Sequence, residues 1–222
     1  MIENPKVAIV DFGLGNLFSI KLACEASGLT PKITSDPYET TGADALILPG
    51  VGAFGDAMES LERLGLISAI MEFAASGKPL LGICLGMQLL MSESEEFGSH
   101  KGLGIISGPV VRFRDIGNKK IKVPQVGWNR IFKTDSGGWD SSSLKGIGDG
   151  TYMYFVHSYY AVPSLSEAVL CETDYEGHRY CSGISWRNIS AFQFHPEKSS
   201  KMGVMIYRNW AETVINNKRS MV

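Results

Sequence analysis

The first ninety residues alternate short apolar runs with stretches in which apolar residues recur every three or four positions. Buried strands are predicted at the apolar runs, residues 7–10, 45–48 and 80–83. Helices are predicted at the periodic stretches, residues 17–24, 66–74 and from Leu85 onward, with Gly28, Gly77 and Pro79 as stop signals. Strands that alternate with helices in this way predict an α/β fold, a mostly parallel central sheet flanked by helices.

The pattern changes after about residue 108 to short β-rich segments. These lie at residues 110–113, 127–132, 152–156, 168–172, 181–186 and 189–194. The tight turn at 186–189 favours an antiparallel hairpin, so we expect additional antiparallel β segments in the C-terminal half, at one edge of the sheet or in a small second sheet.

The chain closes with a helical pattern and a polar end. One helix face is predicted at Met202, Met205, Ile206, Trp210 and Val214, and a frayed polar tail is expected from about residue 216. The serine-rich stretch 134–143 is the most loop-like part and is expected to be a surface excursion. With 222 residues and no repeat or linker, we expect a single domain over residues 1–222.

Composition and charge reduce the number of function classes that fit this sequence. Twenty-one Lys and Arg residues against 23 Asp and Glu give a net charge of -2, which argues against nucleic acid as a partner. The sequence has no basic leader and no apolar run of about 18 residues, so we expect a cytoplasmic protein without a membrane partner. The four cysteines are far apart and none lies beside a histidine at ligand spacing, which predicts neither a metal site nor a disulfide framework.

The sharpest candidate for chemistry is Gly82-Ile-Cys84-Leu-Gly86, between a predicted strand and a predicted helix. A nucleophile at such a turn has a strained backbone, and glycines two residues away remove side chains that would collide there. The helix N-terminus favours a thiolate and supplies free amides for an oxyanion. The structural alternative is a buried apolar cysteine between two glycines.

A cysteine nucleophile needs a base, and His195 has the best surroundings. It follows an apolar strand, and Glu197 is placed two residues later, where an extended chain returns to the same face. Glu197 would then orient the ring of His195. The alternatives at this point are a capping histidine with a solvated glutamate, and His157, which also follows a strand but has no carboxylate at that spacing. His100 and His178 are expected in exposed loops.

Two glycine-bearing turns offer backbone amides. The turn Gly50-Val51-Gly52 follows a buried strand and is a candidate oxyanion site, although glycines are common in such turns. The turn 11–16 lacks the third glycine of a dinucleotide fingerprint, and no Gly-Lys-Ser/Thr motif is present. We therefore expect no bound nucleotide and no cofactor.

Taken together, these stretches resemble the class I glutamine amidotransferases, in particular the glutaminase subunits of histidine biosynthesis. The resemblance rests on Asp11-Phe-Gly-Leu-Gly-Asn-Leu17, Leu48-Pro-Gly-Val-Gly-Ala-Phe-Gly-Asp56, Gly82-Ile-Cys-Leu-Gly-Met-Gln88, Pro124-Gln-Val-Gly-Trp-Asn129, Tyr154-Phe-Val-His-Ser-Tyr159 and Phe194-His-Pro-Glu-Lys-Ser-Ser200. It implies a class I glutamine amidotransferase fold and a Cys-His-Glu triad of Cys84, His195 and Glu197.

The resemblance also implies roles for the surrounding residues. Cys84 would form a γ-glutamyl thioester and release ammonia, while His195 moves the protons. The oxyanion would meet the amides of Leu85 and of Gly50, Val51 and Gly52, whose arrangement is coupled in the family to the partner's site. The α-carboxylate and α-amino groups of glutamine would be held by Gln88, Glu96 and the backbone at Ser158 and Tyr159. His157 becomes scaffolding of the pocket.

The implied partner is a separate (β/α)8-barrel cyclase subunit in a heterodimer. This cyclase receives the ammonia and forms imidazole glycerol phosphate and aminoimidazole carboxamide ribonucleotide. The family's interface positions match Trp128, Asn129, Lys198 and Asn16. The chain departs from the family at Phe12, usually Tyr, and at Gln125-Val126, usually His-Met, and we expect these departures to affect the partner contact rather than the glutaminase chemistry.

Other functions remain open at this point. A paralogous subunit supplies ammonia for the amidation of a sugar in surface-polysaccharide synthesis, and its motifs would look much like these. The alternatives from other classes are a stand-alone cysteine hydrolase and a catalytically silent docking subunit.

Overall fold

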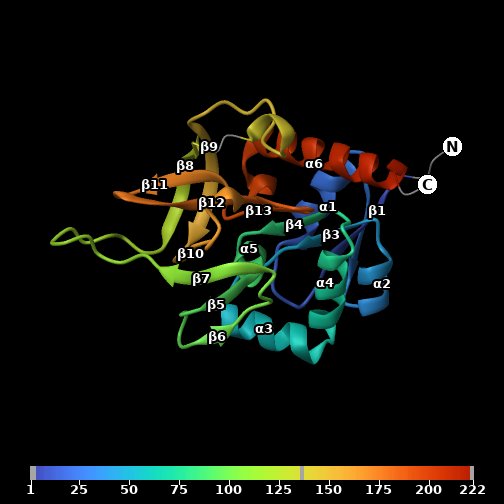
Figure 1. Ribbon diagram of the computed structural model, residues 1–222, viewed down its shortest axis with the longest axis horizontal. Coiled ribbons are helices and arrows are strands. Elements are labelled where there is room, and N and C mark those ends of the chain that lie inside the picture. The colour runs from blue at the N-terminus through green and yellow to red at the C-terminus, as the bar shows by residue number, and fades with distance from the viewer. Residues whose placement is uncertain (1–3, 136–137, 221–222) are drawn as a thin grey trace.

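A computed structural model describes residues 4–135 and 138–220 (Figure 1). In the described part, a nine-stranded sheet has the order β2-β1-β3-β4-β13-β12-β11-β8-β9. Neighbouring strands are parallel from β2 to β13. These parallel strands are β1 (Lys6–Val10), β2 (Thr30–Thr34), β3 (Ala45–Leu48), β4 (Leu80–Ile83) and β13 (Ile189–Phe192). The result is the mostly parallel α/β sheet that the alternating pattern predicted.

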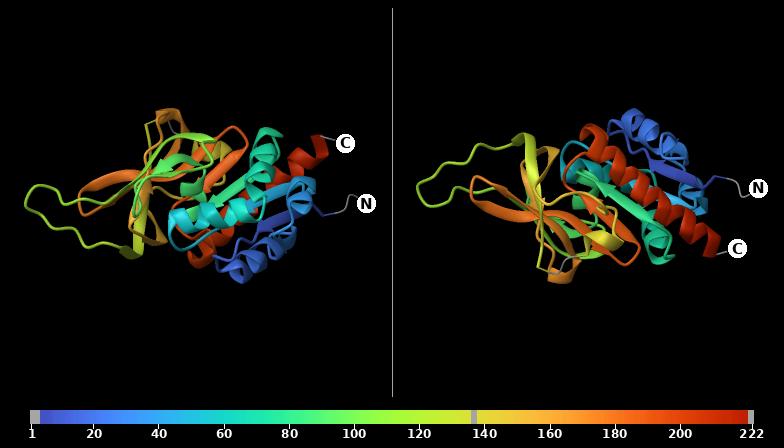
Figure 2. Two further views of the ribbon diagram at one scale, coloured as in Figure 1. Left: turned by 90° about the horizontal axis from the view of Figure 1, so that it is seen from below. Right: turned by 90° about the horizontal axis from the view of Figure 1, so that it is seen from above.

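The rest of the large sheet is antiparallel. It comprises β8 (Gln125–Lys133), β9 (Thr151–His157), β11 (Val169–Tyr175) and β12 (His178–Trp186). A second sheet has the order β10-β7-β5-β6 and comprises β5 (Met91–Ser94), β6 (His100–Lys101), β7 (Ile106–Arg112) and β10 (Tyr159–Ala161). Both forms of additional β structure expected for the C-terminal half are thus present. The segment between β7 and β8 extends away from the body of the protein (Figures 1 and 2).

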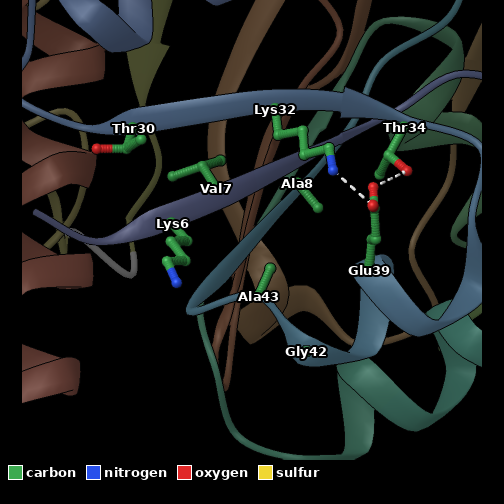
Figure 3. Close-up of a pocket in the computed structure, with 9 residues that line it drawn as sticks. All are labelled: Lys6, Val7, Ala8, Thr30, Lys32, Thr34, Glu39, Gly42 and Ala43. Carbon is green, nitrogen blue, oxygen red and sulfur yellow. Dashed lines mark hydrogen bonds and ion pairs between the residues drawn. The ribbon is translucent and has the colours of Figure 1, made fainter.

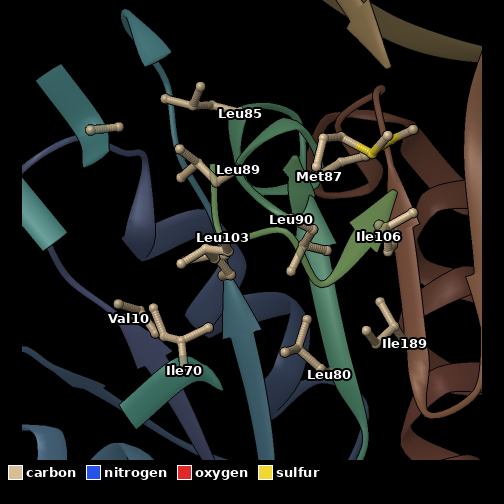
Figure 4. Close-up of a cluster of buried hydrophobic side chains, with 14 of the residues drawn as sticks. Val10, Ile70, Leu80, Leu85, Met87, Leu89, Leu90, Leu103, Ile106 and Ile189 are labelled. Atoms are coloured by element: carbon tan, nitrogen blue, oxygen red, sulfur yellow. The ribbon is translucent and has the colours of Figure 1, made fainter. Parts of the chain in front are cut away.

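Two layers of helices cover the sheet because its buried strands are apolar on both sides. One cluster joins Val7, Ile9 and Ile47 to α1 (Leu17–Glu25) and α6 (Ser200–Ser220). The other joins the alternate strand residues, such as Val10 and Leu80, to the remaining helices (Figure 4). These are α3 (Phe54–Arg63), α4 (Leu66–Ala75) and α5 (Leu85–Leu89), while α2 (Pro37–Gly42) packs against α4 and β1.

The predicted elements are confirmed where the pattern is strong. Strands β3 and β4 have the predicted bounds, and the turn at 186–189 joins the antiparallel pair β12 and β13. The sequence reading missed β2, α2 and α3. For α2, a signal was present: Asp36 precedes Pro37 and its carboxylate caps Tyr38 N and Glu39 N.

The frayed tail expected from about residue 216 was wrong, whereas the described residues of the stretch 134–143 are mostly exposed or half-buried, as expected of a surface excursion. Residues 216–220 are the last turn of α6 rather than a frayed tail, because Lys218 pairs with Asp44 at 2.9 Å and Asn217 donates to the Gly77 carbonyl. The stretch 134–143 is anchored by Trp139, which is buried in a short 3-10 helix, η1 (Trp139–Ser141), and donates to the Leu170 carbonyl. Residues 136–137 and 221–222 of these two segments lie outside the described residues.

Two histidines also differ from expectation. His100 and His178 are half-buried and begin strands β6 and β12 rather than lying in exposed loops. None of the helices in the described ranges has the length and apolar character needed to span a bilayer.

Candidate active site

Cys84 lies at the turn between β4 and α5, at the carboxyl end of a parallel strand. Its φ of 53° is in the left-handed region, so the strained backbone predicted for this position is confirmed. The flanking glycines are required by space: a Cβ on Gly86 would lie 1.8 Å from the Leu48 carbonyl oxygen. The backbone N–H of Cys84 donates to Phe192 O at 2.8 Å, which ties the turn to β13.

His195 and Glu197 lie just beyond β13, where η3 (Pro196–Lys198) begins. The His195 Nδ1 and Glu197 Oε1 atoms are 2.8 Å apart, and both side chains are almost fully buried. The Ser199 hydroxyl donates to the His195 carbonyl and accepts from Tyr154 N, so a serine that the sequence reading did not use fixes this segment against β9.

The electrostatics of this group favour a charged imidazole. Burial of the ring lowers the pKa of His195, but the neighbouring Cys84 and Glu197 side chains outweigh burial and raise the pKa from 6.5 to about 10. His195 Nε2 is buried and has no partner within the described residues. This nitrogen is therefore the ring atom left for proton transfer.

A cavity of about 280 Å³ opens beside Cys84. It brings together most of the positions that the resemblance assigned to glutamine and its oxyanion, namely Val51, Gly52, Cys84, Leu85, Gln88, Glu96, Ser158 and Tyr159. Pro124, Val156 and His157 also line it. Gly50 is buried beside the cavity, where a Cβ would meet the Phe12 ring at 3.0 Å and Leu85 Cβ at 3.1 Å.

Gln193 is a site residue that the sequence reading missed. It is fully buried between Phe192 and Phe194, its Oε1 accepts from Gln88 Nε2 at 3.0 Å, and its Nε2 lies 3.8 Å from Cys84 Sγ. A second bond from Gln88 Nε2 to Tyr159 O, at 2.8 Å, leaves Gln88 Oε1 for a ligand. The sequence signal that could have identified Gln193 is a polar glutamine between two phenylalanines at the end of an apolar strand.

Glu96 faces the cavity and also holds the start of α3. Its Oε2 accepts from Phe54 N, the first residue of that helix, at 2.7 Å. Burial raises the pKa of Glu96 above its ordinary 4.5, against the effect of this hydrogen bond. The carboxyl group is therefore held in place on one oxygen.

His157 stands in a buried chain of polar groups. Its Nδ1 lies 2.8 Å from Tyr159 O, its Nε2 lies 3.1 Å from the Tyr180 hydroxyl, and Tyr180 donates to Gln125 Oε1 at 2.9 Å. Burial lowers the pKa of His157 to about 4, so the ring is neutral at pH 7. This position suits a scaffold better than a base for Cys84.

The expectation that the unusual residues face the partner was wrong for two of three. Phe12 is buried against the Gly50 turn, and Gln125 is buried in the His157 chain. Only Val126, with 60% of its surface exposed, faces outward, because successive residues of β8 point to opposite sides. Phe12 and Gln125 therefore support the glutaminase site from inside.

The four predicted interface residues occupy different settings. Trp128 is 53% exposed and packs edge-on against Tyr154, whose ring also lies 5.9 Å from Lys198 Nζ. Asn129 is instead bound to Asp174 O at 2.8 Å. Asn16 is exposed at the start of α1, a helix that packs against η3.

Other cavities and thiols lie away from Cys84. A cavity of about 420 Å³ lies at the outer edge of the sheet between β1, β2 and α2, where Glu39 bonds to both Lys32 and Thr34 (Figure 3). Burial raises the pKa of Cys24 and of Cys171 to about 12 and raises that of Cys181 as well. These three thiols are packing groups rather than nucleophiles.

Comparisons with known proteins agree with the fold. The family model for glutamine amidotransferase class-I matches residues 8–212. A putative GMP synthase protein from Thermoplasma acidophilum superimposes with a TM-score of 0.72 at 19% identity, over 100% of this chain and 99% of that one. PurLQS from Thermotoga maritima superimposes with a TM-score of 0.66 at 17% identity, over 96% and 98%. The chain therefore belongs to the class I glutamine amidotransferases.

Within this class, curated relatives are similar over nearly their whole length. The imidazole glycerol phosphate synthase subunit HisH of Chlorobium luteolum is 45% identical over 206 residues, covering 93% of this chain and 99% of the relative. The HisH of Aquifex aeolicus is 46% identical over 207 residues, covering 92% and 95%. These names do not favour the sugar-amidating alternative.

Proposed function

We propose that this chain is the glutaminase subunit of an imidazole glycerol phosphate synthase, which hydrolyses glutamine and passes ammonia to a cyclase subunit in histidine biosynthesis. The similarity to HisH subunits supports the assignment. The single observation that carries the chemistry is the placement of Cys84, at a strained turn, next to the cavity and to the buried His195–Glu197 pair.

The first half-reaction forms a thioester. Cys84 Sγ, as a thiolate, attacks the side-chain carbonyl carbon of glutamine, and the carbonyl oxygen becomes an oxyanion. His195 Nε2 then gives its proton to the leaving nitrogen, the C–N bond breaks, and ammonia leaves. Glu197 holds Nδ1, which keeps Nε2 directed at the reacting atoms.

The second half-reaction releases glutamate. Neutral His195 takes a proton from water, the hydroxide adds to the thioester carbon, and the C–S bond breaks to restore the thiolate and the charged ring. We assign the oxyanion to the amides of Leu85, at the start of α5, and of the Gly50-Val51-Gly52 turn. Val51 and Gly52 line the cavity, which supports this assignment.

The far end of the cavity is assigned to the α-groups of glutamine. Gln88 and Glu96 hold the α-carboxylate and the α-amino group of glutamine, together with the backbone at Ser158 and Tyr159. Gln88 is fixed by two hydrogen bonds and Glu96 by one, so neither needs to reorganise when glutamine binds.

The partner surface is assigned to the exposed group formed by Trp128 and Lys198 around Tyr154, with Asn129 and Asn16 at its margins. An exposed tryptophan backed by a second ring is typical of an interface hot spot. A (β/α)8-barrel cyclase that accepts ammonia is the partner, because ammonia released into bulk water at pH 7 is largely protonated and no longer nucleophilic.

The test measures glutamate release by the purified chain, alone and with a histidine-pathway cyclase and its nucleotide ligand. We expect low activity alone, a strong rise with both additions, and none with Cys84→Ala. Cys171→Ala is the matched control, since that buried thiol has no assigned role.

Two outcomes would contradict the proposal. Glutamate release by Cys84→Ala in the assembled complex would contradict the proposed thioester mechanism. A folded wild-type chain that is not stimulated by the cyclase would remove the histidine-pathway assignment but leave the amidotransferase chemistry.

A further inference from the structure

A polar cavity of about 530 Å³ lies at the end of the sheet opposite Cys84. Pro79, which precedes β4, lines this cavity, whereas Cys84 follows β4 at its other end. Pro79 and Cys84 are five residues apart along β4, which separates them by roughly 16 Å at 3.3 Å per residue. The cavity is therefore distinct from the glutaminase site, and it is bordered by the end of α4, the β12–β13 turn and α6.

Hydroxyl groups dominate the wall of this cavity. They come from Ser141, Ser142, Ser143, Ser185, Ser190 and Thr213. Three of these serines belong to the serine-rich segment to which the glutaminase chemistry gives no role. The Ser143 and Ser190 hydroxyls are bonded to each other at 3.2 Å, which leaves one of their two protons for a ligand.

Among the described residues, Arg187 is the only charged one that lines the cavity, and no carboxylate lines it. Its guanidinium lies 5.5 Å from the centre of the Trp186 ring, and it forms no ion pair within residues 4–135 and 138–220. The partial negative end of α4 also borders the cavity. There, Asn188 Nδ2 donates to Ala74 O and Lys78 O, which covers carbonyls that would repel an anion.

Trp210 supplies a second unused donor. Trp210 is one of the residues that line the cavity, it is 1% exposed, and its Nε1 has no partner among the residues that the structure describes. A buried N–H without an acceptor is unfavourable, because it has lost its hydrogen bond to water. Trp139 shows the satisfied case, because its Nε1 donates to Leu170 O at 2.8 Å.

We propose that this cavity binds a small oxyanion, the phosphate or carboxylate group of a metabolite, between the Arg187 guanidinium and the Trp210 indole N–H. Both groups only donate hydrogen bonds, so they match a ligand group that only accepts them. A guanidinium also fits the paired oxygens of phosphate and carboxylate. The Ser143–Ser190 pair and Ser185 complete the set of donors around the anion, because the Ser141 and Ser142 hydroxyls already donate to Gly138 O and Trp139 O.

The test follows the indole N–H signals of the ¹⁵N-labelled full chain by NMR, with the Trp210 signal assigned from Trp210→Phe. Inorganic phosphate and acetate are titrated separately, and NaCl of equal ionic strength serves as the blank. We expect a saturable shift of the Trp210 signal and a static Trp139 signal. A response to phosphate alone identifies a phosphate group as the ligand, and a response to acetate alone identifies a carboxylate.

Variants decide which residues hold the anion. Arg187→Gln should weaken binding at least about tenfold, the effect of losing a charge-assisted bond. Arg130→Gln is the matched control, because Arg130 also stacks on an aromatic ring, 5.0 Å from the centre of Tyr152. Cys84→Ala should bind as the wild type does, which separates this inference from the proposed function.

The inference is overturned by no saturable Trp210 shift with either anion, or by unchanged affinity in Arg187→Gln.

Discussion

At the scale of single residues, the candidate chemistry depends on a few side chains whose surroundings change their charge. His195 and His157 are both buried, yet their pKa values move in opposite directions, to about 10 and about 4. Cys84 and Glu197 act on His195, whereas the hydrogen-bond partners of His157 are neutral. Two histidines that the sequence alone left in competition are thereby separated.

The first prediction concerns stability and pH. In the folded chain His195 keeps its proton up to about pH 10, whereas an unfolded histidine loses it near 6.5. The folded state therefore binds more protons between these values, and the stabilisation by His195 is complete below pH 6.5 and lost as the pH rises to about 10. Urea unfolding across this range should show the difference in unfolding free energy between wild type and His195→Gln shrinking with pH.

His157→Gln supplies a control of opposite sign. The folded pKa of His157 is about 4, so its contribution is present above pH 6.5 and lost as the pH falls toward 4. A pH-independent difference for His195→Gln would contradict the charged state assigned to that ring.

A second prediction concerns Glu96. Glu96→Gln keeps an oxygen for Phe54 N but removes the charge that faces the cavity. Losing a hydrogen bond to a charged group costs about 1.5–3 kcal/mol, so KM for glutamine should rise roughly 10-fold to 100-fold while kcat changes less. Steady-state kinetics of the complex measures this, with the exposed Glu93→Gln as control. An equal loss in kcat at unchanged KM would place Glu96 elsewhere in the mechanism.

At the scale of elements, close backbone approaches hold the nucleophile turn in place. The turn joins β4 to α5, and Gly86 allows α5 to lie directly on the end of β3. The strain at Cys84 persists because both flanking elements are anchored in the core. Strand β4 lies between two strands, and α5 is held by its own buried Leu85, Met87 and Leu89 (Figure 4).

Gly86→Ala is the corresponding prediction. The added Cβ would meet the Leu48 carbonyl at 1.8 Å, a backbone atom that no side-chain rotation can move away. We expect a loss of at least about 3 kcal/mol in the unfolding free energy, measured by urea denaturation. Gly42→Ala is the matched control, since it meets nothing within 4 Å and should change stability by less than about 0.5 kcal/mol. Similar values for the two variants would refute the close approach.

At the scale of the whole molecule, the nine-stranded sheet places the candidate active site and the proposed partner surface on its two halves. Cys84 follows the parallel strand β4, whereas Trp128 and Tyr154 lie on the antiparallel strands β8 and β9 (strands labelled in Figure 1). Lys198, in η3, lies beside the Tyr154 ring. His195 joins the two halves, because its backbone N–H donates to Tyr154 O at 2.9 Å. A partner on β8 and β9 would therefore touch a strand that is bonded directly to the base.

Trp128→Ala tests this arrangement. Removal of an exposed ring backed by Tyr154 should weaken binding of the cyclase by at least about 2 kcal/mol, or roughly 30-fold in Kd. Isothermal titration calorimetry measures the change. Tyr38→Ala is the control, because Tyr38 is also exposed but lies on α2, at the other end of the sheet. Unchanged affinity in Trp128→Ala would move the interface away from β8 and β9.

The sequence by itself determined the features that depend on residues close to one another along the chain. Helix and strand periodicity, the glycines around Cys84 and the two-residue spacing of His195 and Glu197 depend on contacts within a few positions, so they are readable from the chain. Weaker local patterns were not recognised in the sequence. Strand β2 is an example, because its Pro31 and Lys32 are residues that suit an edge strand rather than a buried one.

Only the tertiary structure decided which distant residues meet. Gln193 joins Gln88 to Cys84, and Gln125 and Phe12 turn inward, because the order of the strands and the packing of both sheet faces select one side for each residue. The same packing turns the expected polar tail into helix by bringing Lys218 to Asp44. Periodicity specifies which residues are buried, but the strand order specifies which residues they are buried against.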